Sequence, residues 1–271
     1  MKIIKFLIII FITLIATYKN SLAETNGGIK HINIEDRYYL DDQINLTYVV
    51  RSLGLKIAKL DFEVNFLEAQ YFSTAVIKTQ GIGDLFSNSS WTFSARGTLK
   101  ETHISPKFYN NHIETKRGVG HISIVYRGKY HNILARPEMK YLKELELYRN
   151  LNPNIIDPLS SILEMAIYPP NEICTGEWEV TDGRRIFLIN YEFKPTVSKC
   201  GVKYTPLIGF SEKEMEKEEE DPSPYHLLEL VRINLNNNIS ILIPRIIEAN
   251  GGPSAIIELQ TLRVNGEVMK F

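Results

Sequence analysis

Strict alternation of apolar and polar residues is the dominant pattern of this chain, and it predicts β-strands. From Lys59 to Phe66 every even-numbered residue is apolar and every odd-numbered residue is polar. Because successive side chains of a strand point to opposite faces, this segment predicts a strand with one buried and one solvated face. The following segment, Tyr71–Thr79, is rich in β-branched and aromatic residues and stops at Gly81, so the two segments predict a hairpin.

Similar patterns predict strands throughout the rest of the chain. The segments are Ile122–Tyr126, Phe187–Phe193, Val231–Leu235, Ile239–Ile247 and Ile256–Leu262. The last two flank the turn residues Asn250–Pro253, which predicts another hairpin.

One segment is predicted to be a helix. Asp157 is a suitable N-cap and Pro158 suits the first helical position, while Leu159, Ile162 and Ala166 recur at helical spacing. Residues 169–170 are both proline and are expected to end this helix.

The chain also contains an acidic segment, residues 211–224, that has no apolar face. A solvated loop is the simplest interpretation, and a docking segment for a partner protein is the alternative.

Sequential strand pairs with one helix between two sets predict a mainly β fold. We expect an antiparallel, strongly curved sheet or a barrel-like fold, with the helix flanking or plugging it. A two-sheet β-sandwich is the alternative. Residues 24–271 are expected to form a single β-rich domain, because undivided β domains reach roughly 200–250 residues.

The first 23 residues have the pattern of a signal peptide. Lys2 and Lys5 give the chain a positively charged start, and Ile3–Ala16 is a nearly unbroken apolar run. Small residues at Ser21 and Ala23 predict cleavage after Ala23. The apolar run is shorter than the ~20 residues that span a bilayer, although an uncleaved anchor is an alternative. The sequence therefore predicts a periplasmic protein whose mature form has no transmembrane segment.

Composition limits the classes of partner. The chain is 44% hydrophobic and 23% charged, which is normal for a globular protein. Its formal net charge is −1, so no global field favours nucleic acid, and no nucleic-acid partner is expected.

The chain has two cysteines, Cys174 and Cys200. An even number of cysteines in an exported protein predicts a disulfide. A redox pair or a thiol nucleophile is the alternative, although the Cys-x-x-Cys spacing is absent.

No catalytic motif, metal site or cofactor site is predicted. A Gly-x-Ser-x-Gly nucleophile motif is absent. His112 and His121 are expected to lie near each other across a hairpin, but a zinc site needs a third ligand. The chain is therefore more consistent with a protein that is not an enzyme.

A candidate ligand site begins at a turn. Asp182 and Gly183 favour a tight turn, after which Arg184 and Arg185 start a strand. Adjacent residues of a strand point to opposite faces, so one arginine is expected to face inward. It would form a salt bridge or hold the polar end of a ligand. The alternating row that follows would form core or line a cavity for an apolar ligand; it consists of Phe187, Ile189, Tyr191 and Phe193.

At these residues the chain resembles the family of exported proteins of Gram-negative bacteria catalogued as domain of unknown function 3108. The matching pieces run in order from about Tyr48 to Leu262: Thr79–Gly81, Ala95–Leu99, Ile104–Pro106 with Tyr109, Asp157–Ser160, Cys174, Asp182–Arg185, Cys200, Pro206–Phe210 and Ile243–Ile246. The resemblance implies a periplasmic, β-rich, barrel-like protein similar in shape to periplasmic lipoprotein carriers. It implies no catalytic residues, because the family has no established activity.

These observations lead to a hypothesis of ligand binding. We expect a periplasmic protein that binds an apolar or amphipathic ligand, such as a lipid, in a barrel-like cavity. The first alternative is an interaction or scaffold protein of the cell envelope that docks a partner protein without a small-molecule ligand. A hydrolase with residues distant in sequence is the second alternative.

Overall fold

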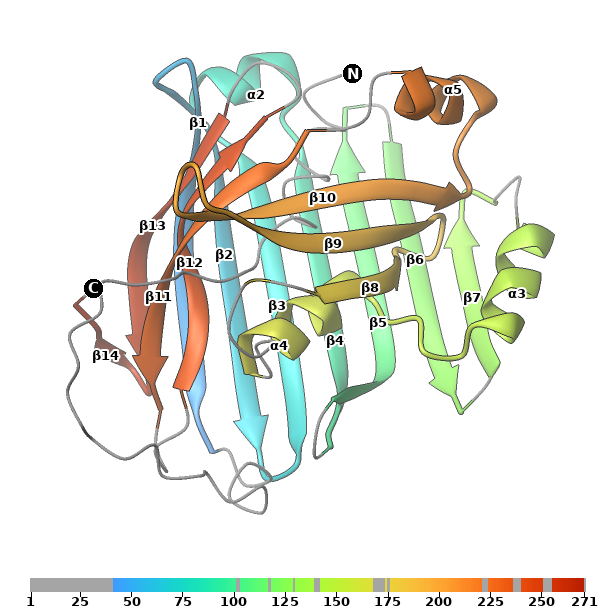
Figure 1. Cartoon of the computed structure of the whole chain (residues 1–271), viewed down its shortest axis with the longest axis horizontal. Coiled ribbons are helices and arrows are strands. Elements are labelled where there is room, and N and C mark those ends of the chain that lie inside the picture. Colours follow the sequence, from blue (N-terminus) through green and yellow to red (C-terminus); the bar gives the residue numbers. More distant parts are fainter. Residues whose placement is uncertain are drawn as a thin grey trace.

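The structure is a computed structural model that describes residues 41–100, 103–116, 118–128, 130–138, 142–167, 174, 176–220, 224–235, 240–250 and 255–270. The predicted signal peptide lies outside these residues. The predicted mainly β fold is confirmed: the strands form one continuous antiparallel sheet of 14 strands that is not closed into a barrel (Figure 1).

The elements have the following bounds. The strands are β1 (Gln43–Ser52), β2 (Leu55–Leu67), β3 (Gln70–Thr79), β4 (Ser90–Leu99), β5 (Ile104–Thr115), β6 (Gly118–Arg127), β7 (Tyr130–Arg136), β8 (Gly176–Thr181), β9 (Ile186–Lys194), β10 (Lys199–Ile208), β11 (His226–Asn234), β12 (Ser240–Ala249), β13 (Ala255–Val264) and β14 (Glu267–Val268). The helices are α2 (Ile82–Phe86), α3 (Leu142–Leu151), α4 (Pro158–Ile167) and α5 (Glu212–Glu220).

The sheet consists of two runs of sequential strands joined by one long-range pairing. Strands β7 to β1 follow one another in order, β1 pairs with β13, and β13 to β8 complete the order. Strands β8–β10 lie across the face of the first run (Figure 1). The turn between β8 and β9 contacts β6, because a Cβ atom on Gly183 would lie 2.4 Å from the Ile122 Cγ2 atom. The sheet is therefore strongly curved, so that strands β8–β10 at one edge cover strands near the opposite edge.

The alternating pattern of β2 has the predicted consequence. Leu60, Phe62, Val64 and Phe66 are each at most 7% exposed, whereas the residues between them are half-buried. Strand β2 pairs with β3 over the whole predicted hairpin, from Ala58–Thr79 to Leu67–Gln70. Burying one face of the strand fixes its register, because a shift of one residue would turn that face to water.

Helix α4 covers the interior of the curled sheet, and it begins where the sequence predicts. The Asp157 carboxylate accepts hydrogen bonds from the backbone N–H of Ser160 at 2.9 Å and from its hydroxyl at 2.5 Å. The Ser160 hydroxyl lies 2.6 Å from the Tyr71 hydroxyl of β3. This capping arrangement satisfies helix donors that would otherwise be unpaired, and it attaches the N-terminus of α4 to the sheet.

The acidic segment 211–224 is not a loop throughout, because residues 212–220 form helix α5. Ser211 and Glu214 form a capping box: the Glu214 carboxylate accepts from the Ser211 N–H at 3.0 Å, and the Glu214 N–H donates to the Ser211 hydroxyl at 3.3 Å. Lys203 of β10 lies 3.8 Å from the Glu218 carboxylate. Good helix formers and a strong cap thus compensate for the missing apolar face.

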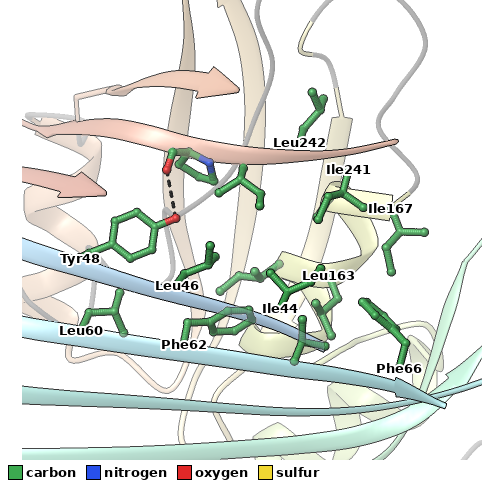
Figure 2. Close-up of a pocket in the computed structure, with 15 residues that line it drawn as sticks. Ile44, Leu46, Tyr48, Leu60, Phe62, Phe66, Leu163, Ile167, Ile241 and Leu242 are labelled. Carbon is green, nitrogen blue, oxygen red and sulfur yellow. Dashed lines mark hydrogen bonds between the residues drawn. The ribbon is translucent and has the colours of Figure 1, made fainter. Parts of the chain in front are cut away.

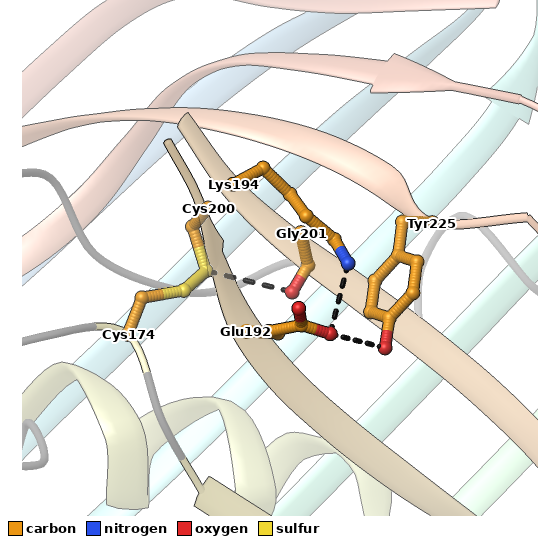
Figure 3. Close-up of a disulfide and its surroundings, with 6 residues drawn as sticks. All are labelled: Cys174, Glu192, Lys194, Cys200, Gly201 and Tyr225. Atoms are coloured by element: carbon orange, nitrogen blue, oxygen red, sulfur yellow. Dashed lines mark hydrogen bonds and ion pairs between the residues drawn. A yellow bond between two sulfur atoms is a disulfide. The ribbon is translucent and has the colours of Figure 1, made fainter. Parts of the chain in front are cut away.

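The predicted disulfide is confirmed. Cys174 and Cys200 are bonded, with their Cα atoms 5.8 Å apart, and both are fully buried. Figure 3 shows the bond beside β10, next to a polar group on the neighbouring strands. In this group the Glu192 carboxylate accepts from the Tyr225 hydroxyl at 2.6 Å and lies 2.8 Å from Lys194. The bond joins the chain that follows α4 to the second half of the sheet.

Replacing both cysteines with serine should destabilise the fold. By the chain-entropy model a loop between residues 26 apart contributes about 3–4 kcal/mol to the free energy of unfolding. Denaturant unfolding of the double variant measures the loss, and wild type treated with a reductant is the control. Equal stability of the oxidised protein and the double variant would contradict the prediction.

Asp157→Ala should lower the free energy of unfolding by about 2–4 kcal/mol, because it removes the helix cap and leaves buried donors unpaired. Asp157→Asn is the matched control, since asparagine caps helices about as well as aspartate. Thermal and denaturant unfolding measure the loss of stability in the two variants. A loss as large in the Asn variant would show that the charge, and not the cap, is the essential feature.

Wild type and Asp157→Asn should also differ in pH dependence, because only wild type has a carboxyl group at this position. Burial raises the pKa of Asp157 to about 6, above its ordinary value of 3.8. The folded state therefore binds the proton more tightly, and the resulting stability is present below about pH 4 and lost as the pH rises through about 6. The unfolding free energy of wild type relative to Asp157→Asn should decrease over this range. A constant difference between pH 4 and pH 7 would contradict this account.

Candidate ligand-binding site

An apolar pocket lies between strands β1 and β2, helix α4 and strand β12 (Figure 2). It has a volume of about 40 Å³. The lining residues are Ile44, Leu46, Tyr48, Leu60, Phe62, Val64, Phe66, Ile162, Leu163, Ala166, Ile167, Ile241, Leu242, Ile243 and Pro244. Each of them has an apolar side chain except Tyr48, which is amphipathic.

Pairing between β1 and β2 places six of the fifteen lining side chains opposite one another. Ile44, Leu46 and Tyr48 of β1 stand opposite Val64, Phe62 and Leu60 of β2. Opposed residues point to the same face of a sheet, so the alternating pattern of both strands produces one continuous apolar wall. The C-terminal half of α4 supplies the opposite wall through Leu163, Ala166 and Ile167.

The one polar atom among these side chains is already bonded. The Tyr48 hydroxyl donates to the backbone carbonyl of Pro244 at 3.0 Å (Figure 2). Burial raises the pKa of Tyr48 well above its ordinary value, so the phenol stays neutral. The lining side chains therefore select for apolar groups and disfavour polar or charged groups, which would lose their hydration without compensation.

A second cleft of about 720 Å³ lies on the other side of α4 and has both polar and apolar groups in its lining; we call it the polar cleft because it contains the charged side chains that the apolar pocket lacks. Lys100, His103 and Lys107 line it, together with Glu164 of α4 and Trp178 of β8. The Glu164 carboxylate accepts a hydrogen bond from the Ile104 N–H, and burial raises its pKa to about 7. Burial thus favours the neutral form of Glu164.

The predicted arginines lie at the expected turn. The Asp182 carboxylate accepts from the backbone N–H groups of Arg184 and Arg185 at 2.7 and 2.8 Å. The Arg184 guanidinium donates to the Pro137 carbonyl at 3.1 Å, and the Arg185 guanidinium lies 4.9 Å from the centre of the Phe210 ring. Both arginine side chains therefore contact residues that pack beside this turn.

The predicted aromatic row lies in the core. Phe187, Ile189 and Tyr191 are buried, and Phe193 is half-buried. The ring centres of Phe187 and Tyr204 are 4.7 Å apart, and those of Tyr191 and Trp178 are 5.2 Å apart. Neither this row nor the two arginines are among the fifteen residues that line the apolar pocket.

The pocket residues of β2 and α4 were predicted only as buried faces, and no strand was predicted at β1. The alternation of β2 and the helical spacing of α4 correctly mark Phe62, Val64 and Leu163 as buried. Whether two buried faces leave a space between them depends on how the sheet curls and where the helix lies, and neither is encoded in local periodicity.

His112 and His121 pair across β5 and β6, as predicted, with ring centres 6.4 Å apart. His112 lies 3.1 Å from the Glu114 carboxylate. In the part of the chain that the structure describes, no group of three or more potential metal ligands is present.

Comparison with known proteins adds no relative. No protein-family model and no curated protein matches this chain. Among the described residues no helix is long and apolar enough to cross a membrane. The resemblance to the family of domain of unknown function 3108 stays a prediction, and the function has to be argued from the two cavities.

Proposed function

We propose that this protein binds an apolar molecule, or the apolar part of an amphipathic molecule such as a lipid, in the pocket beside α4. The lining of that pocket carries the proposal. Fifteen side chains from two strands, a helix and a third strand converge on it, and its one hydroxyl is bonded to Pro244. Such a lining favours burial of hydrocarbon at roughly 0.8 kcal/mol per methylene group.

The small volume of the pocket limits the size of the ligand that it can hold without a structural change. A volume of 40 Å³ accommodates about one water-sized group, so a longer chain requires one wall to move. The last turn of α4 is the suitable wall, because Ala166 and Ile167 make apolar contacts. The rest of the helix is held by the hydrogen bonds of Asp157, of Ser160 with Tyr71 and of Glu164 with Ile104. Binding is therefore expected to displace the end of α4 while its start stays in place.

A hydrolytic function is less well supported. Ser160 lies between a carboxylate and a phenol, an arrangement that could be compared with a nucleophile and its partners. However, Ser160 and Asp157 are both 0% exposed, and Asp157 bonds the first turn of α4. Burial at a helix start favours a capping role over chemistry on a substrate.

The proposed location is the periplasm. A buried disulfide is typical of proteins that fold in an oxidising compartment, and the first 23 residues have the pattern of an export signal. A binding protein in this compartment would shield an apolar ligand from water.

Filling the pocket should weaken ligand binding. Ala166→Leu adds three carbon atoms to the pocket wall, and excluding two methylene groups of a ligand would weaken binding by roughly tenfold. N-phenyl-1-naphthylamine, an uncharged probe that fluoresces in apolar surroundings, measures the affinity. The matched control is Ala69→Leu, the same substitution at a half-buried position between β2 and β3 outside the pocket.

Wild type and Ala69→Leu should bind the probe equally, and Ala166→Leu should bind it at least tenfold more weakly. Equal binding by all three proteins would exclude the pocket as the site. No binding by wild type would contradict the proposed function.

A further inference from the structure

Several side chains of the described residues have buried polar atoms without a hydrogen-bond partner, and three of them lie together outside the apolar pocket. They are Arg149 of α3, Tyr126 of β6 and His131 of β7. Among the described residues, none bonds the three nitrogens of the Arg149 guanidinium, the Tyr126 hydroxyl or either ring nitrogen of His131. Arg149 is only 2% exposed. Buried polar groups are nearly always bonded, so this cluster requires an explanation.

The three side chains are neighbours. The rings of Tyr126 and His131 meet edge to face with their centres 4.7 Å apart. Arg149 and His131 also line a polar pocket of about 170 Å³ together with Asn132, Glu146 and Asn150. The unpaired groups therefore form one cluster between two strands and a helix.

This cluster connects two cavities. His131 lines the small pocket and also the 720 Å³ polar cleft, and Tyr126 lines the cleft. The cleft carries Lys100 and Lys107 on its wall. An anion bound at the cluster would lie beside a cleft with additional positive charge and space for a larger molecule.

The charge of Arg149 determines the kind of ligand. A guanidinium keeps its proton in proteins and presents five N–H donors in a planar fork. A buried charge without a partner is strongly unfavourable, and a neutral water molecule does not remove the charge. An oxyanion matches the fork with two parallel hydrogen bonds.

Three carboxylates of the described residues line these cavities or act on Tyr126. Glu146 lines the same small pocket, but its side chain is exposed and bonds none of the guanidinium nitrogens. Glu164 lines the cleft and accepts from the Ile104 N–H, and Asp157 bonds Ser160. None of the three bonds Arg149 in this structure.

We propose that Arg149, His131 and Tyr126 bind an oxyanion, specifically a phosphate group, either free or at the end of a molecule that extends into the polar cleft. Arg149 pairs with the charge, and His131 and Tyr126 supply further hydrogen bonds. The three nitrogens are screened from water, so the anion reaches them by rotation of the exposed side chains of the pocket wall. This site lies across α4 from the apolar pocket, and its failure would leave the proposed function untouched.

The test compares the thermal stability of three proteins in increasing inorganic phosphate at constant ionic strength. The melting temperature of wild type should rise by about 3–5 °C for each tenfold increase of phosphate above the dissociation constant. Arg149→Met should show no such rise, and without phosphate it should melt at the same or a higher temperature than wild type, because the unpaired charge is gone. Arg127→Met, which removes an exposed arginine of β6, should respond like wild type.

Equal phosphate-dependent shifts in wild type and Arg149→Met would overturn the proposal. So would an equal loss of melting temperature in Arg149→Met and Glu146→Gln, because it would identify Glu146 as the partner in solution. If Arg149→Met does not fold, equilibrium dialysis of wild type against labelled phosphate decides, and no binding at millimolar phosphate overturns the site. Tighter binding of glycerol 3-phosphate than of phosphate supports an end group, and equal binding supports the free ion.

Discussion

The apolar face of an open sheet has to be covered, and the rest of this structure depends on how that is done. The sheet of 14 strands does not close, so its inner face is not sealed by pairing alone. Strands β8–β10 curl over the strands near the opposite edge of the sheet (Figure 1), and α4 fills the space between the two layers. The buried contacts of Asp157 with Ser160 and of Ser160 with Tyr71 fix where that helix starts. Apolar packing is not directional, so these polar contacts give the helix a defined position.

The position of α4 also separates two cavities of opposite character. Leu163 and Ile167 face an apolar pocket, whereas Glu164 between them faces a polar cleft. Neighbouring positions on a helix point in different directions, so one short helix can present hydrocarbon to one side and a carboxylate to the other. The two proposed ligands therefore differ in chemistry, and each can be tested without the other.

Much of the fold could be predicted from the sequence. Alternation predicted seven of the strands and the buried face of β2. Asp157 and Pro158 predicted the start of α4, and the cysteine count predicted the disulfide. The acidic segment was predicted as a loop because it has no apolar face, but Ser211 and Glu214 cap a helix there. Local hydrogen bonds can therefore stabilise a helix that has no buried apolar face.

The sites were harder to predict, because both depend on contacts between distant segments. The sequence directed attention to Arg184 and Arg185, whose neighbours in the chain form a recognisable turn. The unpaired arginine is instead Arg149, which lies in a helix that the pattern did not reveal. Burial of a charged residue is unusual, and it becomes visible only when α3 is seen against β7. Likewise, the apolar pocket consists of residues that look like ordinary core.

Native mass spectrometry of the protein, purified without detergent from its own cells, tests the central claim most directly. The account predicts an added mass that is lost on denaturation and proves to be an apolar or amphipathic compound, and that is strongly reduced in Ala166→Leu. A bare protein mass for wild type in repeated preparations, together with an unoccupied apolar pocket after incubation with lipid, would contradict a binding role for this pocket.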